Sequence, residues 1–181
     1  MNQPVKSKAS LYRTVAAAVF ALTLALMAAP AFSSAAFHGY SGGLDTLDMR
    51  FGYSAGDVYT LMRALGSGGR AFYARYLYLD LLFTVSFAVV QDSLMRRAMG
   101  KTLVGSVWRL LPTLAYPRAF LDISENCSIL FLMARLPAEF PGVAAATGFV
   151  TQGKFILLGC WLAALPVCYL IRKNRERRLL P

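Results

Sequence analysis

Two carboxylates stand in the middle of an apolar stretch of this chain. Asp122 and Glu125 interrupt the run Ala119-Phe-Leu-Asp-Ile-Ser-Glu-Asn-Cys-Ser-Ile-Leu-Phe-Leu-Met-Ala134. If this run spans a membrane, both side chains lie near the centre of the hydrocarbon. A charge there costs about 2.5–3.5 kcal/mol on translocon scales. A cost of that size indicates a role for the two acids, either in ion pairing or in ligand or proton chemistry.

Charged side chains also occur inside two other apolar segments, as Asp80 and Lys154. Counting 1.5 Å per residue from the expected outer helix ends places Asp122 at about 20 Å, Lys154 at about 16 Å and Asp80 at about 14 Å. These depths agree within about one helical turn, so the groups share one layer, with Thr151 and Gln152 as further polar candidates. The predicted ligand-binding or proton-relay cluster comprises Asp80, Asp122, Glu125, Asn126, Lys154 and Arg118.

The charges of this cluster leave three interpretations open. Lys154 can pair with Glu125 or Asp122, and Arg118 can pair with Asp122 one turn away or extend back to the membrane surface. Three acids then face two bases, so one carboxylate should be protonated, bind a cation or meet a ligand. The main hypothesis is a buried acidic site that binds a small amphiphilic or cationic ligand or relays protons. The alternatives are a structural or assembly subunit with ion-paired staples, and an acid–base enzyme acting on a lipid-like substrate.

Other kinds of chemistry have little support in the sequence. His38 is the single histidine and is expected to be a solvated loop residue. Cys127, Cys160 and Cys168 form no C-x-x-C pair and are expected to be small buried side chains. We therefore expect no cofactor and no metal site, the one alternative being a divalent ion held by carboxylates alone.

Composition and charge indicate an integral membrane protein. Of the 181 residues, 57% are hydrophobic and 15% are charged, whereas soluble domains carry about 25% charged residues. The net charge of +10 is concentrated at the ends of apolar runs, as the positive-inside rule predicts, which argues against a nucleic-acid partner. The clusters are Lys6, Lys8 and Arg13; Arg96, Arg97 and Lys101; and Arg172, Lys173, Arg175, Arg177 and Arg178.

The apolar segments predict an all-α fold, a multi-pass transmembrane bundle of four helices in one domain. The expected spans are about 14–36, 71–90, 110–136 and 143–171. A basic start followed by Pro30-Ala-Phe-Ser-Ser-Ala-Ala36 also resembles a cleaved secretory signal, although a retained first helix is favoured. Both termini are cytosolic if the first helix is retained, and three helices keep the same orientation if it is cleaved.

The first outer loop is expected to contain an extra amphipathic helix at about 55–65. Ser54 is its expected N-cap, with Asp57 completing a capping box. Gly66 would end this helix, and a flexible link would follow over 66–69. Its apolar stripe, which would lie at the interface or cap the bundle, is Val58, Leu61, Met62 and Leu65.

Prolines and glycines are expected to affect helix continuity and helix packing in the rest of the chain. A helix at the membrane surface is expected over 103–111, before Pro112 and Pro117 interrupt or kink the path. In the last span, small residues would allow another helix to approach closely. These are Gly148, Gly153 and Gly159.

Four stretches resemble a family of small four-helix integral membrane proteins. They are Leu47-Asp-Met-Arg-Phe-Gly-Tyr-Ser54, Ala64-Leu-Gly-Ser-Gly-Gly-Arg-Ala-Phe-Tyr73, Leu79-Asp80-Leu-Leu-Phe83 and Leu121-Asp-Ile-Ser-Glu-Asn126. In that family an Asp-x-Arg-x-Gly-Tyr loop precedes Gly-Arg-x-x-Tyr and a helix with an early Asp, and the third helix carries Asp-x-x-Glu-Asn. The resemblance covers about residues 45–130 and implies architecture and candidate positions, including a retained first helix, but no activity. Expected partners are the lipid bilayer, a small amphiphilic ligand, and other subunits in a homo- or hetero-oligomer.

Overall fold

The structure, a computed structural model, describes residues 4–100 and 108–178, and every regular element within these ranges is a helix. Five α-helices make up most of the fold. Short 3₁₀ helices join them. The α-helices are α1 (Pro4–Ala28), α2 (Ser34–Ser41), α3 (Ala55–Met99), α4 (Ala115–Arg135) and α5 (Pro141–Arg178), and the 3₁₀ helices are η1 (Pro30–Phe32), η2 (Leu47–Met49), η3 (Trp108–Leu110) and η4 (Pro112–Leu114).

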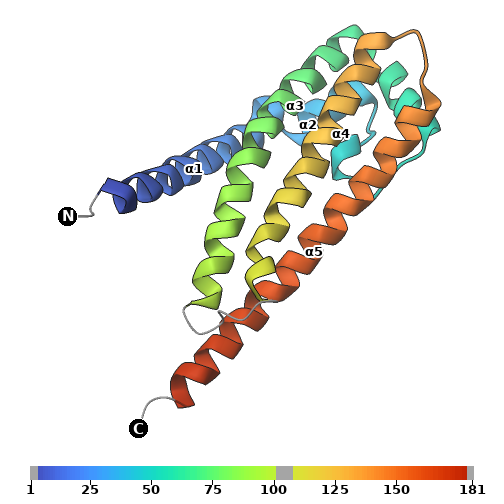
Figure 1. Cartoon of the computed structure of the whole chain (residues 1–181). Coiled ribbons are helices and arrows are strands. Elements are labelled where there is room, and N and C mark those ends of the chain that lie inside the picture. Colours follow the sequence, from blue (N-terminus) through green and yellow to red (C-terminus); the bar gives the residue numbers. More distant parts are fainter. Residues whose placement is uncertain (1–3, 101–107, 179–181) are drawn as a thin grey trace.

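Helices α3, α4 and α5 lie side by side with alternating direction, and α1 leans away from them toward its N-terminal end (Figure 1). Helices α1, α3 and α5 are long and apolar enough to cross a membrane. Helix α4 has 21 residues, but Arg118, Asp122 and Glu125 lower its hydropathy. The all-helical prediction is confirmed for the described residues, and three of the helices found there suit a bilayer by length and composition.

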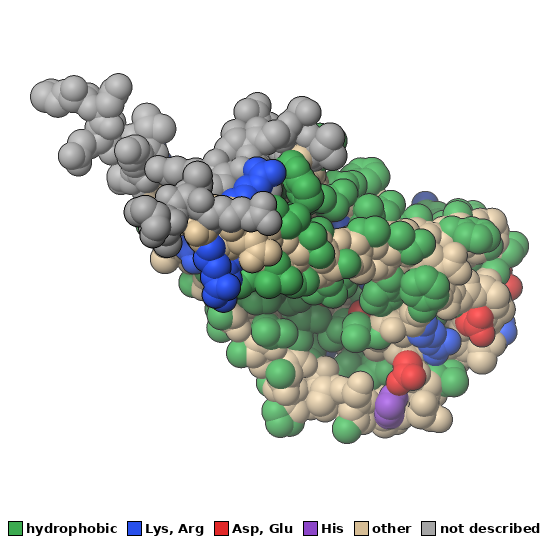
Figure 2. Space-filling model, turned by 90° about the horizontal axis from the view of Figure 1, so that it is seen from below, with side chains coloured by type: hydrophobic (Ala, Val, Ile, Leu, Met, Phe, Trp, Pro, Cys, Tyr) green, Lys and Arg blue, Asp and Glu red, His purple; other side chains and the backbone are tan. Residues whose placement is uncertain are grey.

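Large hydrophobic side chains remain on the outside of this helical fold. Phe120 on α4 is 70% exposed, Phe149 on α5 is 72% exposed and Leu82 on α3 is 59% exposed. Figure 2 shows hydrophobic side chains over much of one face, which is hollowed near its middle. Soluble monomers rarely expose apolar patches larger than a few hundred Å². The outer surface therefore suits contact with lipid.

The first apolar segment is not one continuous helix, which corrects the expectation of a helix over 14–36. Helix α1 ends at Ala28, and Pro30 opens the short helix η1. Proline has no backbone N–H to continue the helical hydrogen bonding. Ser33 then caps α2, because its Oγ accepts a hydrogen bond from the Ala36 N–H at 3.3 Å.

Helix α3 begins as the sequence predicts and then differs from it. Ser54 and Asp57 form the capping box. Gly66 bends the helix with φ +58° and ψ −169°, but residues 67–69 are helical rather than a flexible link. Close packing fixes this segment, since a Cβ at Gly69 would lie 2.9 Å from the Tyr40 Cβ and 3.0 Å from the Leu65 Cβ.

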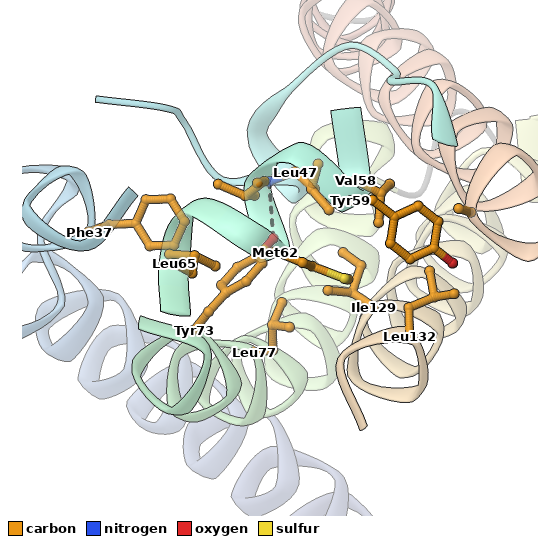
Figure 3. Packing of buried hydrophobic residues seen from close by; sticks show 12 residues of the cluster. Phe37, Leu47, Val58, Tyr59, Met62, Leu65, Tyr73, Leu77, Ile129 and Leu132 are labelled. Carbon is orange, nitrogen blue, oxygen red and sulfur yellow. Dashed lines mark hydrogen bonds between the residues drawn. The ribbon is translucent and has the colours of Figure 1, made fainter. Parts of the chain in front are cut away.

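The start of α3 packs onto the ends of the longer helices and holds the loop that precedes it in place. Its buried apolar residues contact side chains of the later part of α3 and of α4 (Figure 3). Leu47 of η2 is fully buried in the same cluster, and its N–H donates a hydrogen bond to the Tyr73 Oη at 3.0 Å. This contact fixes the loop that carries Asp48 and Tyr53. The core includes Val58, Met62, Leu65, Leu77, Ile129 and Leu132.

The segment before α4 is only partly described. The expected helix over 103–111 lies mostly outside the described residues, and its described end is the 3₁₀ helix η3. A second 3₁₀ helix, η4, begins at Pro112. Helix α4 then begins at Ala115, so Pro117 falls in its first turn, where proline needs no hydrogen-bond partner.

Three glycines of α5 face different parts of the structure. Gly153 faces α4, because a Cβ there would lie 3.0 Å from Leu121 Cδ1. Gly148 instead faces a loop, since a Cβ there would lie 2.1 Å from the carbonyl oxygen of Tyr53. A Cβ at Gly159 would meet no described atom within 4 Å. The prediction that all three glycines admit another helix therefore agrees with the structure only at Gly153.

Gly148→Ala should destabilise the fold, because the added methyl group would collide with the backbone at Tyr53. Overpacking of this kind lowers the free energy of unfolding by about 1–3 kcal/mol. The matched control is Gly159→Ala on the same helix, which should be neutral or stabilise by up to about 1 kcal/mol. Thermal unfolding of both variants in nanodiscs measures the difference. Equal stability of the two variants would contradict the packing of this loop against α5.

Candidate functional site

Asp122 of α4 is the centre of a buried ion-pair network. Its Oδ1 lies 2.8 Å from Lys154 Nζ of α5, and its Oδ2 lies 2.9 Å from Arg118 Nη1. The hydroxyl of Thr84 on α3 donates a second hydrogen bond to Oδ2 at 2.8 Å. All four side chains are buried. Asp122 thus links three helices at one point.

Glu125 is fully buried one turn further along α4. Its Oε1 accepts hydrogen bonds from Thr151 Oγ1 at 2.5 Å and from the Tyr53 hydroxyl at 3.2 Å. Its Oε2 lies 2.5 Å from Lys154 Nζ, and this contact is electrostatic because Oε2 has no aligned hydrogen-bond donor. One ammonium group therefore neutralises parts of two carboxylates on α4.

Arg118 turns its guanidinium into the bundle instead of extending to the membrane surface. Besides Asp122, its Nε donates a hydrogen bond to Gln91 Oε1 at 2.8 Å. Its Nη2 contacts the carbonyl oxygen of Thr84 at 3.4 Å, and its Cζ lies 4.9 Å from the centre of the Phe87 ring. The sequence left two interpretations of Arg118 open, and the structure shows the ion pair with Asp122.

Asp80 of α3 has no cation within ion-pair distance among the described residues. Its Oδ2 accepts a hydrogen bond from Asn126 Nδ2 at 2.6 Å. The Oδ1 of Asn126 is buried without a hydrogen-bond partner in the described structure. This corner of the site therefore contains a carboxylate that is held in place but not neutralised.

Asp48 of η2 is a fourth buried acid, which the sequence analysis did not place in the site. Its Oδ1 accepts a hydrogen bond from the Tyr73 hydroxyl at 2.9 Å. Burial raises the pKa of Asp48, while the nearby charge of Lys154 and the Tyr73 hydrogen bond act in the opposite direction. The signal was present in the sequence, because the stretch Asp48-Met-Arg-Phe-Gly-Tyr53 carries two residues of this site.

Some of these side chains line a cavity of about 220 Å³, which Glu125 does not border. Three acids line it: Asp48, Asp80 and Asp122. Lys154 and Arg118 also line it, and both are already paired with Asp122. The remaining wall is apolar and largely aromatic, formed by Met49, Phe83, Phe87, Phe155 and Leu158.

The structure brings the predicted cluster together, with differences at its edges. Thr151 joins it through Glu125, but Gln152 packs against Gly52 instead, since a Cβ on Gly52 would lie 2.6 Å from Gln152 Nε2. His38 is partly exposed in α2, and its Nε2 lies 2.8 Å from Asp45 Oδ1.

The cysteines differ from the expectation that all three are buried. Cys168 is buried, whereas Cys127 and Cys160 are exposed on the outer faces of α4 and α5. Among the described residues, no group of three or more His, Cys, Asp and Glu side chains is arranged to hold a metal ion. The chemistry of the site is therefore that of buried carboxylates, two paired cations and aromatic faces.

Lys154→Met should lower the free energy of unfolding by about 3–5 kcal/mol, because it leaves buried carboxylates without their cation. The double variant Lys154→Met, Glu125→Gln should recover most of this loss, since Asp122 keeps Arg118. Lys173→Met, at an exposed position of the same helix, is the control and should change stability by less than about 0.5 kcal/mol. Denaturant unfolding in micelles measures all three. A double variant no more stable than the single one would contradict the pairing.

Comparison with known proteins identifies no relative of this chain. No family model matches the sequence, and no curated protein or solved structure matches it significantly.

Proposed function

We propose that this chain is a multi-pass integral membrane protein whose buried acidic site binds a small organic cation. The four spanning helices would be α1, the part of α3 after Gly66, α4 and α5, with the start of α3 as an amphipathic helix of the first outer loop. Support comes from three helices that suit a bilayer and from the exposed hydrophobic side chains around them. Both termini would lie in the cytosol, in keeping with the basic ends of α1, α3 and α5.

The observation that carries the proposal is an imbalance of charge around one cavity. Four buried acids contribute to the site, namely Asp48, Asp80, Asp122 and Glu125. Two buried bases, Lys154 and Arg118, both contact Asp122, and Lys154 also contacts Glu125. Asp48 and Asp80 line the cavity with hydrogen bonds from neutral groups only. Burial of unpaired carboxylates is costly, so a bound cation or a bound proton would stabilise them.

The walls of the cavity favour an organic ammonium group. Phe83, Phe87 and Phe155 present aromatic surfaces, and cations are attracted to the faces of such rings. The protein already uses two of these rings in this way, since Arg118 lies over Phe87 and Lys154 Nζ lies 5.4 Å from the centre of the Phe155 ring. A volume of about 220 Å³ is below the range of about 300–1,000 Å³ typical of ligand pockets, so the bound group would be small.

Asp80→Asn should weaken the binding of a small ammonium ion by about tenfold or more, because a charged partner is lost while the hydrogen bond to Asn126 can persist. The probe is choline, compared with its uncharged isostere dimethylbutanol, by calorimetry in nanodiscs. Asp45→Asn is the matched control, since Asp45 is an exposed acid of the same outer region. Choline binding that equals dimethylbutanol binding, or that survives Asp80→Asn unchanged, would contradict the proposal.

Choline affinity should also rise with pH, because Asp48 must lose its proton to attract a cation, and burial raises its pKa. Titrations from about pH 4 to about pH 8 should show this rise in the wild type and a flatter profile in Asp48→Asn. The free energy of unfolding should change with pH in the opposite direction to the choline affinity. A raised pKa in the folded state means that wild-type stability falls, relative to Asp48→Asn, as pH rises through that pKa. A choline affinity that is the same in both proteins at every pH would exclude Asp48 from the site.

A second candidate is a structural subunit, favoured by the ion pairs of Lys154 with two residues of α4. In that case the charges would hold helices together within a membrane complex, and no ligand would be needed. The choline experiment distinguishes the two candidate functions. Asp80→Asn would then change the unfolding temperature without any measurable change in cation binding, because no cation binds.

A further inference from the structure

A second cavity, which shares no lining residue with the acidic one, lies between the N-terminal half of α1 and the C-terminal part of α3. Its volume is about 550 Å³. Arg13 and Arg97 are its only charged lining residues among those described, one from each helix. Ser10 and Ser93 add hydroxyl groups, and Ala17 and Leu94 form apolar wall. We call this cavity the α1–α3 crevice.

The crevice has a structural cause. Phe20 of α1 stacks against Phe83 and Phe87 of α3, with ring centres 5.3 and 5.2 Å apart. Beyond this contact the lining side chains of α1 are mostly short, such as Ser10 and Ala17, and α1 leans away from α3 toward its N-terminus (Figure 1). Side chains therefore close the contact at one end and leave a wedge-shaped space at the other.

The charges of the crevice have no partner within the described structure. Neither Arg13 nor Arg97 forms an ion pair there, whereas the neighbouring Arg96 is paired with Asp92 at 2.8 Å. Ser10 and Ser93 also make no side-chain hydrogen bond in the described structure. Two cations and three hydroxyls thus line the crevice, one of them the Thr14 hydroxyl that donates to the Ser10 carbonyl oxygen, and no acid is among the described lining residues. An anion with several acceptor oxygens, such as a phosphate ester, matches this set.

The position of the arginines indicates which phosphate ester fits. Arg13 immediately precedes the apolar part of α1, and Arg97 lies seven residues beyond Val90, a rise of about 10 Å along α3. Headgroup layers extend about 5–7 Å beyond the hydrocarbon on each side. Leu94, four residues beyond Val90, would lie about 6 Å out, at headgroup level, and the Arg97 side chain slopes toward the N-terminus of α3, back to the same level. Arg13 would lie at the corresponding level of α1, with Ala17 and Val90 at the edge of the acyl chains. Basic pockets between membrane helices commonly take anionic lipid headgroups.

We propose that the α1–α3 crevice binds one anionic phospholipid, with its phosphate between Arg13 and Arg97 and an acyl chain along Ala17 and Val90. This inference rests on the membrane placement proposed above but not on the acidic site, which lies deeper in the bundle. The bound lipid fills the wedge and holds α1 against α3.

Native mass spectrometry of the full chain tests this site. The protein, released from micelles containing equal amounts of dioleoyl phosphatidylglycerol and dioleoyl phosphatidylcholine, should keep one phosphatidylglycerol. Arg13→Gln, Arg97→Gln should reduce the preference for this lipid by about 25-fold, at roughly fivefold for each arginine. The control Lys173→Gln, Arg177→Gln removes the same charge from exposed positions of α5 and should keep the preference.

A variant that fills the crevice distinguishes binding inside the crevice from general attraction of the lipid to a positively charged surface. Ala17→Trp keeps both arginines but fills the crevice, so the retained lipid should be lost while the unfolding temperature without lipid stays near that of the wild type. Arg13→Lys, Arg97→Lys should restore much of the preference. Equal loss in the α5 control, retention in Ala17→Trp, or displacement of the lipid by millimolar inorganic phosphate would overturn the proposal. Choline binding should be normal in every crevice variant, which keeps the two proposals separate.

Discussion

The ammonium group of Lys154 lies between two carboxylates of α4, and the arrangement of the bundle depends on it. Lys154 belongs to α5, so its contacts to Asp122 and Glu125 fix the depth and rotation of one helix against the other. Arg118 and Thr84 extend the same network to α3. Removing one member leaves a buried charge, which is far costlier than replacing the whole set by neutral groups. The network therefore specifies register more than it adds stability.

This pairing also determines which acids remain available. Because Lys154 and Arg118 are both engaged, the carboxyl groups at the cavity without a cation partner among the described residues are those of Asp48 and Asp80. Asp48 reaches the cavity only because Leu47 is buried beneath the start of α3, where its backbone N–H meets Tyr73. A hydrophobic contact in the loop before α3 thus supplies one wall of a polar site.

Much of this layer could be predicted from the sequence. The rise per residue of an α-helix is fixed, so the position of a residue along a helix gives its depth in the bundle. That argument placed Asp80, Asp122 and Lys154 together. It could not place Asp48, since the position of a loop depends on contacts that are distant in sequence, such as the one between Leu47 and Tyr73. The break near Pro30 was also missed, because an apolar composition predicts a long helix unless the proline is given priority over it.

The distribution of charge between α4 and α5 has a consequence for assembly in the membrane. Arg118 and Asp122 lie one turn apart on α4, so they can neutralise each other as soon as that helix forms. Glu125 has no such partner on its own helix and depends on Lys154, which follows later in the chain. Under the proposed four-span arrangement, α4 would therefore enter the bilayer stably only together with α5, as a single unit of insertion.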